Sequence, residues 1–332
     1  MDIRSYKHSV IQGTKFLLSQ QNDDGSLRPV EEGIASYCRV PFALAAMGQT
    51  ERAARLMMYI AESVIDEEGD FVGHFPRSDL FQRYYLVPNA WLISGAHRLG
   101  RFGISLRGIE FLGSLQHPQT GGFFTAGPNA TVSGEQDVLS SATCGLTLLY
   151  CGRLDEAIQV GQYLQYVMDH QPSPAARLLF KTRGTGEVVS EFSEENAAEQ
   201  MMGVGKSKQW YHVPALAAGF LIKLAETTGS TESLDLAQKY LQFIDSCGSD
   251  RYNSEKSGLF GWAAALAYEA TGNQNYRRIA TSVADALLEA QLANGSWLKA
   301  SMGEDLVSDV VDATAENLIA LVQVLEGLVA GD

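Results

Sequence analysis

Two carboxylates and one histidine stand where apolar helices of this chain are expected to begin. Asp309 and Asp312 open a long apolar stretch, and His212 precedes Pro214 at the start of another. A carboxyl group that is partly desolvated beside a like charge keeps its proton to higher pH, and histidine titrates near neutrality. We therefore predict Asp312 and His212 as catalytic acid–base groups, with Asp309 binding substrate beside them. The alternatives are first-turn acids that stabilise a helix dipole and a structural histidine.

Aromatic and arginine side chains gather at the same kind of position. Residues 37–41, 84–88 and 210–214 each read as an aromatic residue, two variable residues and Val-Pro, followed by an apolar run. Proline fits the first turn of a helix, so each stretch marks a helix start. We predict that the side chains near these starts line one cavity, where π faces hold an apolar ligand and arginines hold its polar end. The predicted binding residues are Tyr37, Arg39, Arg83, Tyr84, Tyr85, Trp210, Tyr211 and Trp262. For the arginines, a salt bridge to an acid of the next repeat is the alternative.

Asp137 opens a further apolar stretch together with Ser140, Ser141 and Thr143. We include Asp137 among the predicted substrate-binding residues. Its position at a helix start favours the alternative of a capping residue, whose carboxylate accepts hydrogen bonds from the first turn.

The elements that must position these residues alternate along the chain. Mostly apolar helices are expected at about 34–48, 84–99, 137–151, 210–228, 258–271 and 309–329. Amphipathic helices are expected at about 4–20, 51–65, 104–116, 154–169, 231–245 and 274–291. A helix that is apolar all round is buried, and one with a single apolar stripe lies at the surface. The pattern predicts one all-α domain over residues 1–332, an (α/α)6 barrel with six inner and six outer helices and negligible strand. An open α-solenoid is the alternative.

One interval between inner helices is longer than the others. Residues of about 170–208 hold prolines, an acidic run and glycines at both flanks, and they lead directly into Trp210. A loop this long in a compact domain is typical of a lid. We predict that residues 176–208 cover the cavity mouth, with a plain solvated insertion as the alternative.

The turns after the amphipathic helices share a short motif. Gln21 to Leu27 and Gln291 to Trp297 fit Gln, three residues, Gly, one residue and an aromatic or Leu. Gln116 to Phe123 carries the same pattern with an insertion, and Ile65 to Phe71 keeps only the glycine and aromatic. This motif resembles the QW repeat of the terpenoid cyclase and protein prenyltransferase superfamily, which folds as an α/α toroid. The resemblance implies the toroid fold in a single-domain member. It departs from that superfamily's active sites, because the Asp-x-Asp-Asp acid motif is missing. Asp245-Ser246-Cys247 matches the prenyltransferase zinc pair without its later histidine.

Composition limits the partners. The chain of 332 residues has a net charge of −14, which argues against nucleic acid or an anionic membrane surface. Its four cysteines form no CxxC pair, and we predict reduced thiols, no metal and no cofactor. We also expect no signal peptide and no apolar run long enough to span a bilayer, hence a cytoplasmic protein that acts on a small molecule.

These features predict a cofactor-independent cyclase or isomerase of a largely apolar terpenoid or polyketide, working by acid–base catalysis in a central cavity. A carbohydrate-active (α/α)6 enzyme, such as an epimerase or an unsaturated-uronyl hydrolase, is the second hypothesis. A non-catalytic helical scaffold is the third.

Overall fold

The computed structural model describes residues 3–28, 33–71, 79–128, 134–194, 197–298 and 307–331. The chain divides into two compact units. The first unit is Met1–Ser114 with Ala284–Gln323, and the second unit is Leu115–Val283 with Val324–Asp332. Each unit is described by itself below.

The first unit is built from helices of the early chain. They are α1 (Ile3–Ser19), α2 (Ala35–Cys38), α3 (Val40–Ala46), α4 (Thr50–Ser63), α5 (Asp79–Arg83), α6 (Leu86–Arg98) and α7 (Phe102–Ser114). Two long helices near the end of the chain, α14 (Gln274–Ala290) and α15 (Val307–Ala330), have residues in both units.

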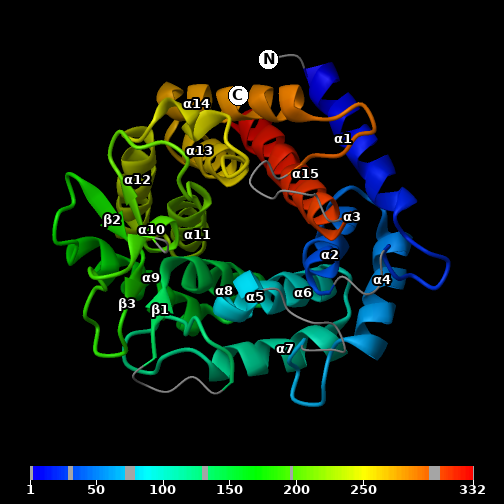
Figure 1. The fold of residues 1–332 in the computed structure, drawn as a ribbon, viewed down its shortest axis with the longest axis horizontal. Coiled ribbons are helices and arrows are strands. Elements are labelled where there is room, and N and C mark those ends of the chain that lie inside the picture. The colour runs from blue at the N-terminus through cyan, green and yellow to red at the C-terminus, as the bar shows by residue number, and fades with distance from the viewer. Residues whose placement is uncertain are drawn as a thin grey trace. The chain divides into compact units, whose positions relative to one another are not determined.

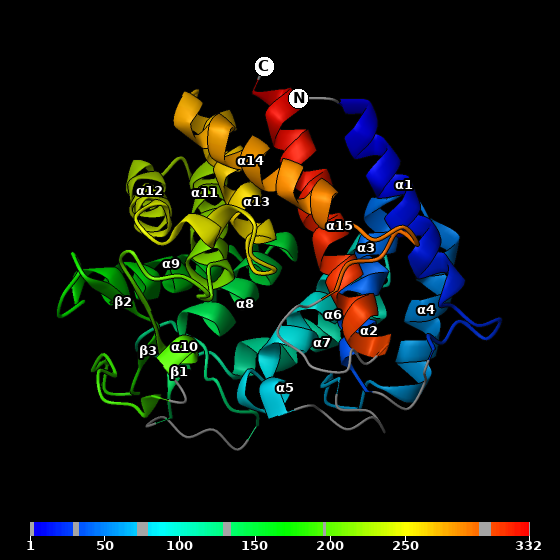
Figure 2. The same ribbon diagram turned by 45° about the horizontal axis from the view of Figure 1, so that its top comes forward.

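The second unit holds the remaining helices and four short strands. The helices are α8 (Val138–Tyr150), α9 (Leu154–Asp169), α10 (Ala197–Gln200), α11 (His212–Thr228), α12 (Thr231–Asp245) and α13 (Gly258–Thr271). The strands are β1 (Gln136–Asp137), β2 (Arg177–Leu179), β3 (Lys181–Thr182) and β4 (Met201–Gly203). Helices α11, α12 and α13 lie next to one another in both views (Figures 1 and 2).

The predicted helices are present with small shifts at their ends, except that the first apolar helix is broken. Arg39 ends α2 and precedes α3, and Pro41 follows in the first turn of α3. Proline has no N–H to donate, so a continuous helix would lose a hydrogen bond at this point. The break leaves Arg39 at a junction between two helical segments. Helices α5 and α10 were not predicted.

The long interval before Trp210 contains ordered strands. β1 pairs with β3 and β2 pairs with β4, both antiparallel. Leu178, Leu179 and Phe180 are buried, and the Gln171 amide holds both backbone groups of Leu179. A plain solvated insertion is therefore wrong for this part of the segment, whereas its role as a lid stays a prediction.

The three complete QW-like turns share one hydrogen-bond pattern. In each, the glutamine Nε2 donates to the glycine carbonyl of its own turn and to a backbone carbonyl of another amphipathic helix. Gln21 joins Gly25 to Arg52, Gln116 joins Gly121 to Glu156, and Gln291 joins Gly295 to Ser9. The last pair belongs to the first unit and connects a late turn to α1, as the earlier turns connect consecutive repeats.

The glycines of these turns have left-handed backbone and lie against a neighbouring helix. Gly25 has φ +94°, and a Cβ added there would lie 2.6 Å from the carbonyl oxygen of Arg55. Gly69, in the turn without glutamine, has φ +96° and meets the carbonyl oxygen of Arg107 at 2.5 Å in the same test. Only glycine combines this φ with this approach, which explains why the residue recurs.

Three of the four turns end on an aromatic residue whose backbone is anchored by an apolar helix. The backbone N–H groups of Phe71, Phe123 and Trp297 donate to the side chains of Asn89, Ser141 and Thr314. These acceptors lie in α6, α8 and α15, and all three are buried. Buried polar side chains in otherwise apolar helices therefore serve to attach the turns.

Helix α15 is apolar enough, over Asp309–Ala330, to cross a membrane by length and composition. The expectation that no run reaches that length was therefore wrong. However, 61% of its most apolar window is buried inside the protein, and core helices of soluble proteins also pass this test.

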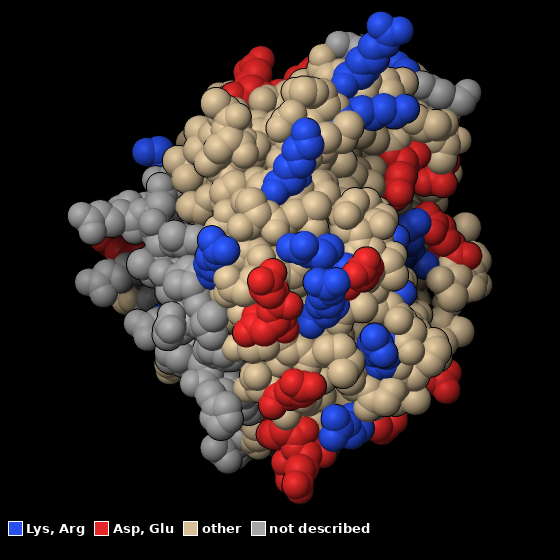
Figure 3. All heavy atoms as spheres, turned by 90° about the vertical axis from the view of Figure 1, so that its right-hand side faces the viewer, with Lys and Arg blue, Asp and Glu red and all other residues tan. Residues whose placement is uncertain are grey.

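On the face drawn in Figure 3, the described basic side chains are interspersed with acidic ones rather than gathered into a patch.

Candidate acid–base site

Asp312, the predicted acid of the first unit, is held in an ion pair. Arg39 Nη1 lies 2.6 Å from Oδ1 and 2.8 Å from Oδ2 of Asp312. The Cys38 thiol approaches the same carboxylate at 3.7 Å, and Glu316 lies 3.9 Å from Arg39 Nη2. Arg39 thus forms a salt bridge, as the alternative expected, but its acidic partners lie in the last helix of the chain rather than in the repeat that follows in the sequence.

This pairing changes the chemistry expected of Asp312. A guanidinium at hydrogen-bond distance favours the ionised carboxylate, which opposes the neutral acid that burial alone suggested. Burial lowers the pKa of Arg39, but the carboxylates of Asp312 and Glu316 outweigh that effect and raise it. The guanidinium also lies 5.6 Å from the centre of the Trp91 ring. The Arg39 guanidinium is thus held by two carboxylates and one aromatic ring.

The other predicted residues of the first unit have varied surroundings. Tyr37 is fully buried and stacks on Tyr59. Tyr84 is buried, and the Tyr85 hydroxyl donates to Asp70. Arg83 ends α5 on the surface, and Asp309 is half-buried in the first turn of α15.

In the second unit, His212 is the first residue of α11, and its ring lies 5.3 Å from that of Trp210. Lys256 Nζ lies 4.5 Å from the Trp210 ring centre.

Tyr211 is buried, and its hydroxyl donates to Asp250 at 2.8 Å. Trp262 of α13 packs against Gly219 of α11. Tyr211 is therefore buried and hydrogen-bonded, and Trp262 is packed between helices of the second unit.

Asp137 has the most unusual environment of the predicted residues. It caps α8, with Oδ1 accepting from the Ser140 N–H at 2.7 Å, so the capping alternative is confirmed. The residue is only 1% exposed, and its Oδ2 accepts no hydrogen bond from the described residues. Burial raises the pKa of Asp137 to about 6, although Ser140 and the Lys181 ammonium oppose the rise. A buried carboxyl with one uncommitted oxygen is a functional-site candidate.

The partner of Asp137 across the strand pair is Lys181, which the sequence did not single out. The two residues are directly opposite in the β1–β3 register. The Lys181 side chain is 8% exposed, and its Nζ lies 3.4 Å from Glu135 Oε2. Lys181 lies in the long interval that is predicted to be a lid, and no sequence spacing connects it to Asp137.

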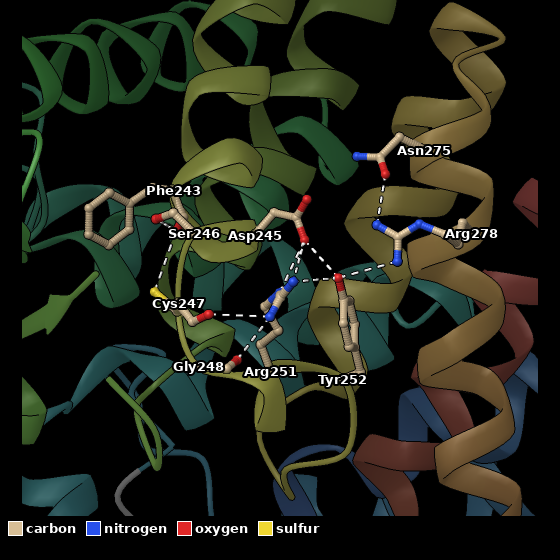
Figure 4. Close-up of polar contacts among 9 residues, drawn as sticks. All are labelled: Phe243, Asp245, Ser246, Cys247, Gly248, Arg251, Tyr252, Asn275 and Arg278. Atoms are coloured by element: carbon tan, nitrogen blue, oxygen red, sulfur yellow. Dashed lines mark hydrogen bonds and ion pairs between the residues drawn. The ribbon is translucent and has the colours of Figure 1, made fainter. Parts of the chain in front are cut away.

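The Asp245 and Cys247 pair does not form a ligand set (Figure 4). Asp245 accepts hydrogen bonds from Tyr252 and from Arg251, at 2.7 and 3.1 Å. The Cys247 thiol instead donates to the Phe243 carbonyl, and burial raises its pKa to about 11. Among the described residues, no group of three or more His, Cys, Asp or Glu side chains is placed to hold a metal ion.

The predicted residues divide between the two units. Tyr37, Arg39, Arg83, Tyr84, Tyr85, Asp309 and Asp312 belong to the first unit, and Asp137, Trp210, Tyr211, His212 and Trp262 to the second. A single cavity lined by all of them stays a prediction.

Comparison with solved structures identifies proteins of the same fold. No protein-family model and no curated protein matches the sequence. A D-mannose isomerase superposes with a TM-score of 0.72 over 98% of both chains, at 13% identity. A type II terpene cyclase from Scytonema, in complex with geranylgeranyl dihydroxybenzoate, superposes with a TM-score of 0.63 over 98% of both chains, at 13% identity. An unsaturated glucuronyl hydrolase specific for heparin gives a TM-score of 0.65 at 14% identity, covering 97% of this chain and 96% of its own.

These neighbours are an isomerase, a cyclase and a hydrolase, so they agree on architecture and differ in reaction. The predicted fold class is confirmed, and the open solenoid is wrong. The chain has the (α/α)6 toroid fold of these enzymes.

Proposed function

We propose that this protein is a cofactor-independent enzyme that transfers protons at carbon in a largely apolar small molecule, as a cyclase or isomerase of terpenoid or polyketide type. The observation that carries the proposal is the buried Asp137 carboxyl with its uncommitted oxygen. Since its pKa is about 6, the group holds its proton in part of the molecules near neutral pH. Such a group can donate a proton to a double bond, and its conjugate base can accept one.

The residues around Asp137 support this assignment. Val138 and Leu139 follow it as buried apolar residues at the start of α8, where a desolvated acid is favoured in its neutral form. His212 begins α11 in the same unit, and α11 packs on α8 through Phe220 and Gly145. We assign His212 as the candidate for the second proton transfer.

The test uses geranylgeranyl dihydroxybenzoate as the probe, in D2O, with product analysis by mass spectrometry. Protonation of a carbon–carbon double bond by Asp137 and loss of another proton from carbon should give an isomeric cyclic product with one deuterium on carbon. The variant Asp137→Asn should lose at least about 100-fold in rate. Asparagine is an equally good cap, so the fold should be kept.

The matched comparison is Asp312→Asn, assayed with the same probe. If folded Asp137→Asn keeps its rate, the assignment to Asp137 is wrong. Because Asp312→Asn is itself expected to destabilise the fold, its rate is compared per folded molecule, and a loss there beside an unaffected Asp137→Asn would make Asp312 the acid.

A carbohydrate isomerase or epimerase is the second candidate, favoured by the polar character of the strand pair beside Asp137. Gln136, Lys181 and Thr182 are all buried there, and such groups are typical of sites that bind hydroxyls. D-Mannose in D2O is the probe for this candidate. Deuterium on carbon in a ketose product, with no turnover of the prenylated probe, would favour it.

A further inference from the structure

Lys181 is held rigidly beside Asp137 by backbone contacts on both sides. The Val138 N–H donates to the Phe180 carbonyl, and the Phe180 N–H donates to the Gln200 carbonyl, at 2.9 and 2.8 Å. The Val189 N–H donates to the Lys181 carbonyl at 2.9 Å. The segment that carries Lys181 therefore cannot move away from β1 without breaking several hydrogen bonds.

The titratable groups that face Asp137 come from strand β3, the loop before β1 and helices α8 and α9. Lys181 lies opposite on β3, and Glu135 lies just before β1 and bonds to Lys181. Cys144 of α8 and Tyr163 of α9 are buried, and the Asp137 charge contributes to raising the pKa of each, after burial. Among these described groups, Lys181 supplies the positive charge. Glu135 is 46% exposed, so it links this cluster to solvent.

We propose that Lys181 is a positioning residue that sets the protonation state of Asp137, and that Glu135 tunes it by sharing the ammonium. This inference deepens the proposed function and rests on it for its catalytic meaning. A buried ammonium next to a carboxylate favours the ionised form. When Glu135 draws the ammonium toward solvent, less of its charge acts on Asp137. Lys181 therefore lowers the pKa of Asp137, and Glu135 raises it.

The experiment measures the titration of Asp137 without any substrate. The free energy of unfolding is measured across pH with and without the substitution Asp137→Asn, in the wild-type, Lys181→Met, Lys181→Arg and Glu135→Gln backgrounds. In the wild type, the difference caused by Asp137→Asn should stop changing near pH 6, the pKa of Asp137. Lys181→Met should move that point upward by about one unit, Lys181→Arg should restore it, and Glu135→Gln should move it downward.

Two results would overturn the inference: an unchanged end point in folded Lys181→Met, or shifts of the same sign in Lys181→Met and Glu135→Gln. If Lys181→Met does not fold, the partly exposed Glu135→Gln decides the question alone, since no downward shift there contradicts the inference. Failure of the proposed function would look different. It would leave these shifts intact while Asp137→Asn turned over the prenylated probe normally.

Discussion

Two aspartates of the same chemical type have opposite surroundings in this protein. Asp312 is buried against the Arg39 guanidinium, whereas Asp137 is buried with one oxygen uncommitted among the described residues. The pairing stabilises the charged form of Asp312, and desolvation favours the neutral form of Asp137. Burial alone therefore does not identify the acid; the partner of the carboxylate does.

The raised pKa of Asp137 predicts a pH-dependent cost. The folded state binds this proton more tightly than the unfolded chain, so its stabilising effect is complete below about pH 4 and is lost as pH rises to about 6. Relative to Asp137→Asn, the wild type should lose about 3 kcal/mol of unfolding free energy across that window. Urea denaturation of both proteins between pH 4 and 7 measures this. A difference that does not change with pH would show that Asp137 titrates normally.

The ion pair in the first unit predicts a large and non-additive loss. Arg39→Met leaves the Asp312 charge buried, and Asp312→Asn leaves Arg39 with the more distant Glu316 as its anionic partner among the described residues. Each variant should therefore cost about 3–5 kcal/mol. This exceeds the roughly 1 kcal/mol expected for Asp312→Asn if the carboxylate had no partner. The double variant should cost less than the sum of the two, as measured by thermal unfolding. Additive costs would mean that the pair is not formed in solution.

At the scale of elements, the sequence predicts the helices but not the contacts between side chains of different elements. The alternation of apolar and amphipathic helices is local, and α9 and α12 have the ends that periodicity predicted. The contacts of Arg39 with Asp312 and of Asp137 with Lys181 are not local, because they join residues from different elements. No spacing within one helix encodes them. The sequence therefore predicts the elements and the candidate residues, but not which carboxylate acquires a cation.

The turn glycines allow a matched test of close packing. Gly121 and Gly152 both have φ of +78°, but a Cβ on Gly121 would collide with the Gln159 carbonyl, whereas one on Gly152 meets nothing within 4 Å. Gly152→Ala should cost about 1 kcal/mol for the left-handed backbone alone. Gly121→Ala should cost about 1–3 kcal/mol more, because the neighbouring helix must move.

Chemical denaturation of the two alanine variants gives this comparison directly. Equal losses would show that the turn after α7 can withdraw from α9 at little cost, and the close approach would then have no energetic weight.

At the scale of the molecule, the connection between the late chain and α1 should be as strong as a connection between consecutive repeats. Gln291 bonds Gly295 and Ser9 at 2.9 and 3.0 Å, and Gln116 bonds Gly121 and Glu156 at the same two distances. Gln291→Ala and Gln116→Ala should therefore lower the unfolding free energy equally, by about 1–3 kcal/mol.

Amide hydrogen exchange of α1 provides a second measurement for this prediction. We expect slow exchange in α1 of the wild type and of Gln116→Ala, and faster exchange in Gln291→Ala. A much smaller loss of unfolding free energy in Gln291→Ala than in Gln116→Ala, with α1 already exchanging rapidly in the wild type, would contradict the prediction.

The make-up of the first unit has a consequence for how the protein is synthesised. Met1–Ser114 leaves the ribosome first, yet its partner segment Ala284–Gln323 emerges only after all of Leu115–Val283. Throughout that interval the nascent chain exposes the face of α1 that later packs on Trp297 and Leu318 at Gly13. Most of the second unit can meanwhile fold as a contiguous segment. We therefore expect the first unit, most of which is synthesised first, to complete its folding last. A chain that ends before Trp297 should be bound by chaperones or degraded.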